Sequence, residues 1–275
     1  MLPEDFQFSQ GKLQDYVDCG RRFQLRHLLM QPWPSVIAAP AAVTEQHWQR
    51  GADFHRLAQQ HTLGLDAELL EPTIDDETLL GWWRTYLEHP PADLPNGPRR
   101  AEVAVATTLA DHRMVAKFDL LASGRDQLVV VDWKTMLKRP TRAALAQRLQ
   151  TRVYRLVAVE AGASFFDGRS PHPEQVVMIY WFAGAGGAVE RFAYDTEQLA
   201  IDHAYLVELV SRVAEAAGEL ESIWPLTADE RRCRFCNYRS LCERGVKAGF
   251  LGDMDEDHDL PELQIDLEQI AEIEF

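Results

Sequence analysis

Leu128-Val129-Val130-Val131-Asp132-Trp133-Lys134 decides the fold: an apolar run ends in an acid, an aromatic residue and a base. Valine-rich runs of this length form strands, and side chains alternate along a strand. Asp132 and Lys134 therefore share one face, and Trp133 points to the other. Because four apolar residues precede Asp132, we expect it at the end of a buried, central strand. An acid and a lysine are costly there unless they have a function.

A second strand is predicted just before this one, over residues 113–122. A hairpin folded about Gly124-Arg125 sets Asp119 opposite Val130, on the same face as Asp132 and diagonal to it, about 8 Å away. Two carboxylates and an ammonium then converge. Such a set offers oxygen ligands to a divalent cation and a positive charge that orients a water molecule attacking a phosphodiester. The alternative is an ordinary hairpin with a salt bridge at its rim.

A helix is predicted over residues 142–160, with Thr141 as its N-cap and Gly162 beyond its end. On this helix Gln150 and Tyr154 are four residues apart and therefore share a face. We expect these two side chains to orient the substrate or the site rather than to bind a metal ion.

The stretch between Asp132 and Glu160 is basic and contains no acid. Its seven basic residues are Lys134, Lys138, Arg139, Arg142, Arg148, Arg152 and Arg155. The last three recur at helical spacing and form a stripe beside the carboxylates. Such a stripe is usually a solvated helix face, but the missing acids and the adjacent site favour a phosphate-binding track. Lys138 and Arg139 are expected to belong to the same track.

The four cysteines are Cys19 and a C-terminal group, Cys233, Cys236 and Cys242, spaced as Cys-x2-Cys-x5-Cys. The chain opens on a short acidic segment rather than a hydrophobic signal, so we expect the reducing cytoplasm, where disulfides are rare. Three cysteines within ten residues then indicate a metal centre. Zinc and an iron–sulfur cluster both accept four thiolates, and inert core thiols are the remaining alternative.

In their order and spacing the motifs resemble the RecB-like branch of the PD-(D/E)XK nuclease superfamily. That branch reads Asp…Asp-Tyr-Lys-Thr and then Gln-x-x-x-Tyr, which Asp119, Asp132-Trp133-Lys134-Thr135 and Gln150…Tyr154 match except for the tryptophan. Its upstream Gly-x-x-x-His is matched by Gly51…His55. The resemblance covers about residues 6–245.

The resemblance implies an α/β (α+β) fold, with a restriction-endonuclease-like αβββαβ core and helical additions at both ends tied by a four-cysteine cluster. A single domain would then span residues 1–250, followed by an acidic tail at 251–275. The patterning agrees with this order. It predicts helices near 10–30, 44–61, 75–89, 142–160 and 195–217, and strands at 102–109, 113–122, 127–135, 176–182 and 189–194.

The resemblance also implies a divalent-metal-dependent DNA nuclease, an exonuclease on single-stranded ends, in DNA repair, recombination or CRISPR adaptation. Lys134 would position the attacking water. The Mg²⁺ or Mn²⁺ ion would be bound by Asp119, Asp132 and the Trp133 carbonyl, with His55 as a further ligand. A lone helix histidine is more often structural, so the role of His55 rests on the resemblance. Glu102 begins a strand at a place where some relatives hold an active-site acid, and its role stays open.

One remote cysteine followed by Cys-x2-Cys-x5-Cys resembles the cluster-bearing RecB-like nucleases of CRISPR adaptation, of the AddB type and of eukaryotic flap processing. This resemblance implies a 4Fe–4S cluster held by all four cysteines. The role of the cluster would be structural, because it would tie the N-terminal helices to the C-terminal segment.

The net charge of −15 is unusual for a protein that binds DNA. Residues 251–275 hold ten acids and no lysine or arginine, which leaves −5 on the rest of the chain. Such a tail is usually a disordered solubiliser, but its interleaved Leu and Ile residues also suit a docking peptide for a protein partner or a lid over the basic track. No apolar run reaches membrane length, so we expect no membrane partner.

Two hypotheses from other functional classes stay open. The first is a catalytically idle subunit that binds DNA ends in a larger complex. The intact set of Asp119, Asp132 and Lys134 argues against it, because a degraded site is expected to lose at least one member. The second is a zinc-stabilised adaptor protein that works through its acidic tail.

Overall fold

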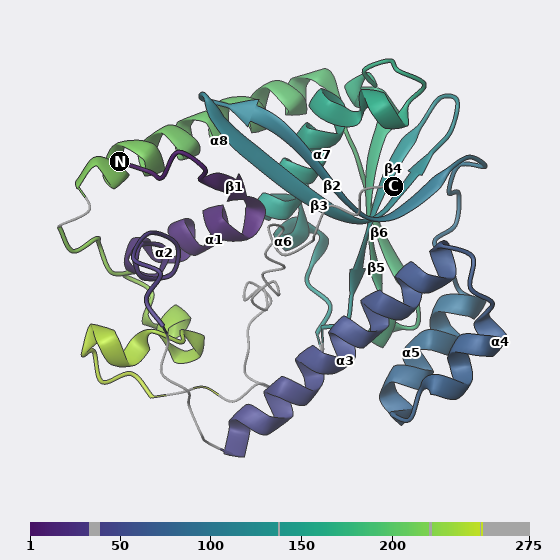
Figure 1. The fold of residues 1–275 in the computed structure, drawn as a ribbon, viewed down its shortest axis with the longest axis horizontal. Helices are drawn as coiled ribbons and strands as arrows, with labels where there is room; N and C mark the ends of the chain where they lie inside the picture. Colours follow the sequence, from purple (N-terminus) through teal and green to yellow (C-terminus); the bar gives the residue numbers. More distant parts are fainter. Residues whose placement is uncertain (33–38, 137, 220–221, 248, 250–275) are drawn as a thin grey trace.

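A mixed sheet with helices on both faces forms the centre of the computed structural model (Figure 1). The structure describes residues 1–32, 39–136, 138–219, 222–247 and 249, with the backbone alone for 39–45 and 235. The tail at 251–275 lies outside the described residues. The strands are β1 (Gln7–Ser9), β2 (Arg99–Leu109), β3 (His112–Ser123), β4 (Leu128–Lys134), β5 (Val176–Phe182) and β6 (Ala188–Ala193).

Helices lie between β1 and β2, between β4 and β5, and after β6. They are α1 (Gln10–Asp18), α2 (Gly20–Phe23), α3 (Ala39–Thr62), α4 (Ala67–Leu70), α5 (Glu77–Glu88), α6 (Arg142–Gln147), α7 (Leu149–Ala161) and α8 (Thr196–Ala216). A π-helical turn η1 (Gln24–Leu28) follows α2, and the 3₁₀ turns η7 (Glu230–Phe235) and η8 (Arg239–Cys242) lie in the C-terminal segment. Within the described residues, no helix combines the length and apolarity that a membrane crossing requires.

The strand pairing matches the predicted αβββαβ order. β2, β3 and β4 form an antiparallel meander, β5 pairs with β4 in parallel, and β6 returns antiparallel to β5. A parallel pair needs a crossover connection, which α6 and α7 provide between β4 and β5. β1 was not predicted, because three residues are too short for a period-two pattern.

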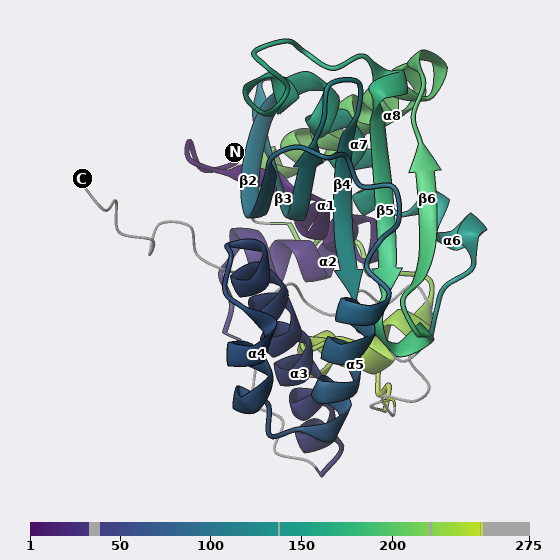
Figure 2. The same ribbon diagram turned by 90° about the vertical axis from the view of Figure 1, so that its right-hand side faces the viewer.

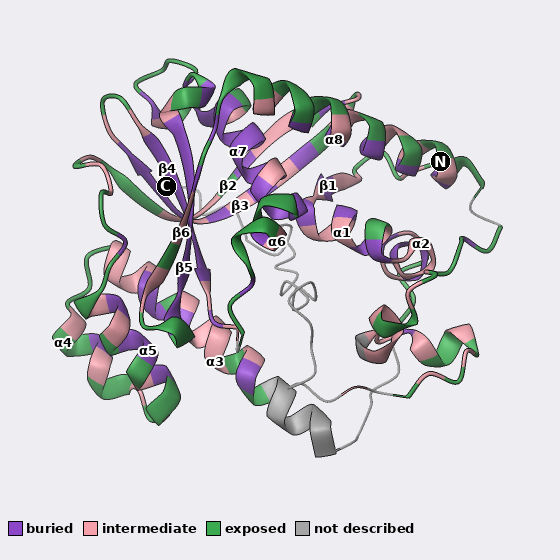
Figure 3. Cartoon of the chain, turned by 180° about the vertical axis from the view of Figure 1, so that it is seen from behind, coloured by how far each residue is buried: buried purple, intermediate pink, exposed green. Residues whose placement is uncertain are grey.

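The central strand β4 is buried on both faces, which explains its uninterrupted apolar run. Leu128 and Val130 belong to the core formed with α1, α7 and α8, whereas Val129, Val131 and Trp133 belong to the core formed with α3 and α5. Figures 2 and 3 show the two helical layers and the buried residues that line the strands between them. The alternation predicted for this stretch is therefore observed.

The helices expected near 10–30 are separated at Cys19, which is extended with φ −166° and ψ 110°. One helix that the sequence predicted as continuous is interrupted. The helix expected at 142–160 breaks at Arg148, where ψ is 139°. The Thr151 hydroxyl donates to the Leu145 carbonyl at 2.5 Å across this break, so a side chain replaces part of the lost backbone bonding. The predicted cap Thr141 is observed, since its Oγ1 accepts the Ala144 N–H at 3.2 Å.

Candidate active site

The candidate site lies at a gap in the sheet. β2 pairs along one edge of β3, whereas the opposite edge is shared by two strands. β1 pairs with β3 at residues 113–115, and β4 pairs with it at 120–123. Residues 116–119 of β3 lie between these two ladders, and Asp119 is the last of them. Its Oδ2 accepts the Trp133 N–H at 2.7 Å, so a side chain continues the pairing where the backbone ladder ends.

The hairpin register differs from the predicted one by two residues. Leu120 pairs with Val131 and Ser123 pairs with Leu128, so continuing the ladder puts Asp119 opposite Asp132 instead of Val130. The turn contains four residues, closed by a bond from the Gly124 N–H to the Gln127 carbonyl at 2.9 Å. Because side chains alternate with period two, a shift of two residues preserves the face. The two carboxylates therefore share one face, as predicted. They lie directly opposite each other on the two strands, whereas the prediction placed them diagonally.

Asp132, Lys134 and Gln150 form a closed polar triangle on the α7 face of the sheet. The Lys134 ammonium lies 2.9 Å from Asp132 Oδ2 and donates to Gln150 Oε1 at 2.9 Å. The Gln150 amide in turn donates to Asp132 Oδ1 at 2.6 Å. Asp132 and Gln150 are both buried, so these bonds act with little competition from water. The crossover helix thus holds the acid and the lysine in one geometry.

His55 reaches the site from the other side, on α3. Its Nδ1 lies 3.4 Å from Asp119 Oδ1. His55, Glu102 and Asp119 each offer a ligand atom, and these atoms all lie within 4.8 Å of one another. Gly51, one turn earlier on α3, allows the close approach, because a Cβ there would lie 3.0 Å from the Thr135 hydroxyl. The upstream glycine–histidine motif therefore lies against Thr135, the residue that follows β4.

Glu102 owes its position to an unusual backbone conformation. Its φ is +55°, in the left-handed region that non-glycine residues seldom adopt, and it lies within a strand. The β2–β3 ladder pairs Ala101 with Leu120 and Val103 with Phe118, and omits Glu102 and Asp119 between them. This local distortion faces both acids toward His55, and a strained residue of this kind is typical of functional sites. Sequence patterning left Glu102 open because it carries no signal of positive φ.

The environment moves the acid pKa values of the two aspartates in opposite directions. Burial and the neighbouring Asp119 charge raise the pKa of Asp132 to about 7, against the opposing effect of Lys134. Burial would also raise the pKa of Asp119, but the His55 charge, together with hydrogen bonds from His55 and the Trp133 N–H, outweighs it and lowers that pKa. Burial would lower the pKa of His55, but the charges of Asp119, Asp132 and Glu102 and a hydrogen bond to Asp119 together outweigh it and raise that pKa. Such a cluster of perturbed groups is typical of a catalytic or metal-binding site.

The other two predicted site residues lie away from the carboxylates. The Trp133 side chain packs in the opposite core, with its ring edge-on to Tyr86 and Trp181. Only its backbone therefore faces the site. Tyr154 is buried on α7 with its ring 5.2 Å from that of Phe118, in an edge-on contact. Tyr154 therefore packs against β3, the strand that carries Asp119.

The predicted arginine stripe lies mostly inside the protein. Arg148 and Arg155 are buried, and the Arg155 guanidinium binds the fully buried Asp202 of α8 at 3.1 Å. Arg152 binds the same carboxylate at 3.3 Å. Asp202 provides the charge that makes the burial of Arg155 tolerable. The burial of Arg148 and Arg155 differs from the expectation, because a buried guanidinium cannot meet a phosphate, whereas the Arg152 side chain is 23% exposed.

Lys138 and Arg139, the other two predicted phosphate contacts, are exposed. They lie in the segment between β4 and α6. Arg139 forms an ion pair with Glu190 of β6. Of the five predicted phosphate contacts, these two have the exposure that contact with a polyanion requires. The sequence did not indicate this ion pair, because Glu190 is 51 residues away from Arg139.

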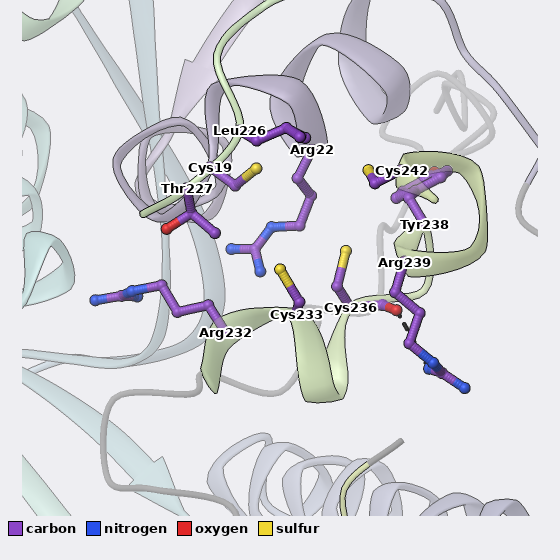
Figure 4. Close-up of a pocket in the computed structure, with 10 residues that line it drawn as sticks. All are labelled: Cys19, Arg22, Leu226, Thr227, Arg232, Cys233, Cys236, Tyr238, Arg239 and Cys242. Carbon is purple, nitrogen blue, oxygen red and sulfur yellow. Dashed lines mark hydrogen bonds between the residues drawn. The ribbon is translucent and has the colours of Figure 1, made fainter. Parts of the chain in front are cut away.

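The four cysteine side chains converge on a second pocket, between the N-terminal helices and the C-terminal segment (Figure 4). Cys19 lies at the break between α1 and α2, Cys233 lies in η7 and Cys242 ends η8, with Cys236 between the two turns. All four are free thiols. The N-terminal helices and the C-terminal cysteine segment therefore lie together, as predicted.

Arginines surround this pocket. Arg22 lines it and is held by Asp15 at 2.9 Å and Asp18 at 2.6 Å, and Arg232 binds Asp18 as well. Arg244 donates to the Thr227 carbonyl at 2.6 Å and lies 3.9 Å from the Cys233 sulfur. Sequence reasoning did not single these residues out, although Arg22 lies three residues after Cys19 and Arg232 immediately precedes Cys233.

Comparison with known proteins places this geometry in a family context. A model of the PD-(D/E)XK nuclease superfamily matches residues 7–243. The crystal structure of a protein named "Putative exonuclease" from Eubacterium rectale is similar at 9% identity and a TM-score of 0.47, covering 80% of this chain and 84% of that one. The crystal structure of SSO0001 is similar at 12% identity and a TM-score of 0.39, covering 90% and 91%. No curated protein matches the chain. The family match runs from β1 to the last cysteine.

Proposed function

The chain belongs to the PD-(D/E)XK nuclease superfamily, and we propose that it is a divalent-metal-dependent DNA nuclease that acts as an exonuclease on single-stranded ends. The observation that carries this proposal is the meeting of Asp119, Asp132 and Lys134 at one gap in the sheet. The preference for single-stranded ends, and a setting in DNA repair, recombination or CRISPR adaptation, follow from the RecB-like spacing of the motifs.

The donor set at the gap fits Mg²⁺ or Mn²⁺. Hard cations take carboxylate and carbonyl oxygens, which Asp119, Glu102, Asp132 and the Trp133 carbonyl offer. The imidazole of His55 favours Mn²⁺ over Mg²⁺. The spacing of ligand atoms within 4.8 Å supports a common ion for His55, Glu102 and Asp119. When bound, the cation supplies Lewis-acid chemistry toward the phosphate and makes a coordinated water more acidic.

The side chains of Asp119, Lys134 and Gln150 have separate roles. Asp119 is oriented by the Trp133 N–H at 2.7 Å, so its other oxygen faces His55, with which it would share the cation. Lys134 carries the positive charge that orients the attacking water and offsets negative charge developing at the phosphorus. Gln150 is a positioning residue, because it fixes both Lys134 and Asp132 through one amide.

Cleavage of end-labelled single- and double-stranded DNA, with Mg²⁺, Mn²⁺ or EDTA, tests this proposal. We expect cleavage with either cation and none with EDTA. Asp132→Ala and Lys134→Ala should each abolish cleavage while DNA binding persists, because metal binding or orientation of the water is lost and the contacts to the DNA backbone remain. Full Mn²⁺-dependent activity in Lys134→Ala would refute the assigned mechanism. Binding of DNA ends by the wild-type protein without cleavage under any condition would favour the idle subunit instead.

We further propose that the four cysteines hold a 4Fe–4S cluster that joins the two ends of the chain. Among the described residues, no three of the cysteine sulfurs come within 4.8 Å of one another. A tetrahedral zinc ion would need sulfurs about 3.8 Å apart. A cluster carries its four thiolates at separate corners and suits the wider spacing. The surrounding arginines would offset the negative charge of a thiolate-ligated cluster, which also supports this choice.

Metal analysis and visible absorbance of anaerobically purified protein test the cluster. We expect iron and sulfide with a brown colour, lost together in Cys236→Ala. Stoichiometric zinc without iron would refute the proposal and support the zinc-stabilised adaptor. The neutral comparison is Ser240→Ala, which changes an exposed residue of the same segment and should leave the iron content unchanged.

A further inference from the structure

One carboxylate on the outer strand of the sheet holds two arginines from the segment after the catalytic strand. Glu190 of β6 binds Arg139 through one oxygen and Arg142 through the other, the latter at 2.9 Å. The carboxylate is 17% exposed, whereas the Arg139 and Arg142 side chains are 38% and 58% exposed. The acid is therefore nearly covered, and both cations are open to solvent.

The same two arginines also make cation–π contacts with aromatic rings. The Arg139 guanidinium lies 5.5 Å from the centre of the Phe182 ring, and that of Arg142 lies 4.5 Å from the Phe192 ring. Arg142 also donates to the Arg191 carbonyl at 2.8 Å. A guanidinium has five N–H donors, so the two bonds of Arg142 leave donors for another acceptor. Stacking and pairing have already restricted both side chains, which lowers the entropy cost of a further contact.

This cluster lies close to the candidate active site. Asp132 pairs with Tyr180 across β4 and β5, and Tyr180 pairs with Glu190 across β5 and β6. Two strand spacings separate Glu190 from Asp132, a distance of about 10 Å. Figure 2 shows α6, whose first residue is Arg142, beside the outer edge of β6. Ten ångströms is about three steps of 3.4 Å along a stacked nucleic acid strand.

The local charge is positive in an otherwise acidic protein. Exposed Lys138 lies next to Arg139 in the chain, so this segment contributes three cations against the single charge of Glu190. Because Arg148 and Arg155 are buried and the Arg152 side chain is only 23% exposed, this group is the most accessible part of the basic stretch among the described residues.

We propose that Lys138, Arg139 and Arg142 bind backbone phosphates of the DNA strand held at the active site, and that Glu190 competes with those phosphates for the two arginines. The inference rests on the proposed nuclease function, because it identifies how that site holds its substrate. Glu190 orients the two guanidinium groups when no DNA is bound, and its charge weakens their attraction for a phosphate. The acid therefore limits affinity while it maintains the geometry.

The test measures binding of a labelled single-stranded oligonucleotide by anisotropy, in EDTA, from 50 to 300 mM salt. Glu190→Gln should bind about five-fold more tightly at low salt, because one competing charge is removed, and the gain should shrink as salt rises. Arg142→Ala should lower the slope of log affinity against log salt by about 0.7, the value for one phosphate contact on a single strand. Arg142→Lys should retain the slope.

A matched control is the pair of Glu71 and Arg84 on the α4–α5 side, which are 2.6 Å apart with side chains 34% and 56% exposed. Glu71→Gln and Arg84→Ala make the same charge changes and should alter neither affinity nor slope. Unchanged affinity in Glu190→Gln, or an unchanged slope in folded Arg142→Ala, would overturn the inference. Failure of the nuclease proposal is seen separately, as absence of cleavage with Mg²⁺ or Mn²⁺ in a protein whose DNA binding still responds to these substitutions.

Discussion

Replacing Gln150 by alanine should slow DNA cleavage by roughly 10- to 100-fold while the protein still folds. The Gln150 amide donates to Asp132 Oδ1 at 2.6 Å and accepts from Lys134 at 2.9 Å. The lysine and the aspartate also contact each other directly at 2.9 Å, so their pairing survives the truncation. The group that sets the lysine amine at a defined angle to the carboxylate is lost. Cleavage suffers because the amine no longer points consistently at the attacking water.

The magnitude follows from the two hydrogen bonds. A hydrogen bond to a charged group contributes about 1.5–3 kcal/mol, and each 1.4 kcal/mol corresponds to a factor of ten in rate. Loss of one such contact in the transition state accounts for the expected range. Gln150 is only 4% exposed, so the truncation should also lower the free energy of unfolding by about 1–3 kcal/mol. That loss is smaller than the usual stability of a domain of this size.

Single-turnover cleavage of a labelled oligonucleotide at saturating Mn²⁺ is the assay, with thermal unfolding measured on the same samples. Gln147→Ala is the control, because it removes the same amide from the exposed end of α6 and should leave the rate unchanged. A wild-type single-turnover rate in Gln150→Ala would refute this reasoning.

Three other outcomes are expected. Because the pKa of Asp132 is raised to about 7, Mn²⁺ must displace a proton below that pH, and affinity measured by calorimetry should fall by about ten-fold per pH unit toward pH 5.5 and level off above 7. Glu102→Gln should weaken Mn²⁺ binding by roughly ten-fold, and an unaltered affinity would remove Glu102 from the ligand set. Arg155→Met should lower the free energy of unfolding by about 3–5 kcal/mol, because it leaves Asp202 with one arginine in the interior. The salt dependence of DNA binding by Arg155→Met should match that of the wild type, and a reduced slope would restore the arginine stripe as a DNA contact.

The two aspartates show why the site requires the whole sheet. Each comes from a neighbouring strand, and the gap between β1 and β4 leaves Asp119 unpaired in the backbone ladder. The helices on opposite faces then supply Gln150 from α7 and His55 from α3. Burial by both layers is what raises the pKa of Asp132 and makes its charge available mainly to a cation.

Patterns within single elements were sufficient to predict the directions of side chains. Alternation along β4 places Asp132 and Lys134 together and Trp133 opposite, because a strand repeats every two residues whatever surrounds it. The helix start at Asp195 was equally local, since its Oδ1 accepts the Gln198 N–H three residues later at 2.7 Å. The order of elements followed from the same signals.

Only the tertiary structure decided which of these directions lead to solvent and which to a partner. The arginine spacing on α7 is the same for a DNA track and for a buried network. Asp202 determines the difference, and it lies 47 residues beyond Arg155. The left-handed backbone of Glu102 has no local pattern either, because the β2–β3 pairing imposes it. Local sequence specifies where a side chain points on its own element, whereas burial and charge pairing depend on elements that meet only after folding.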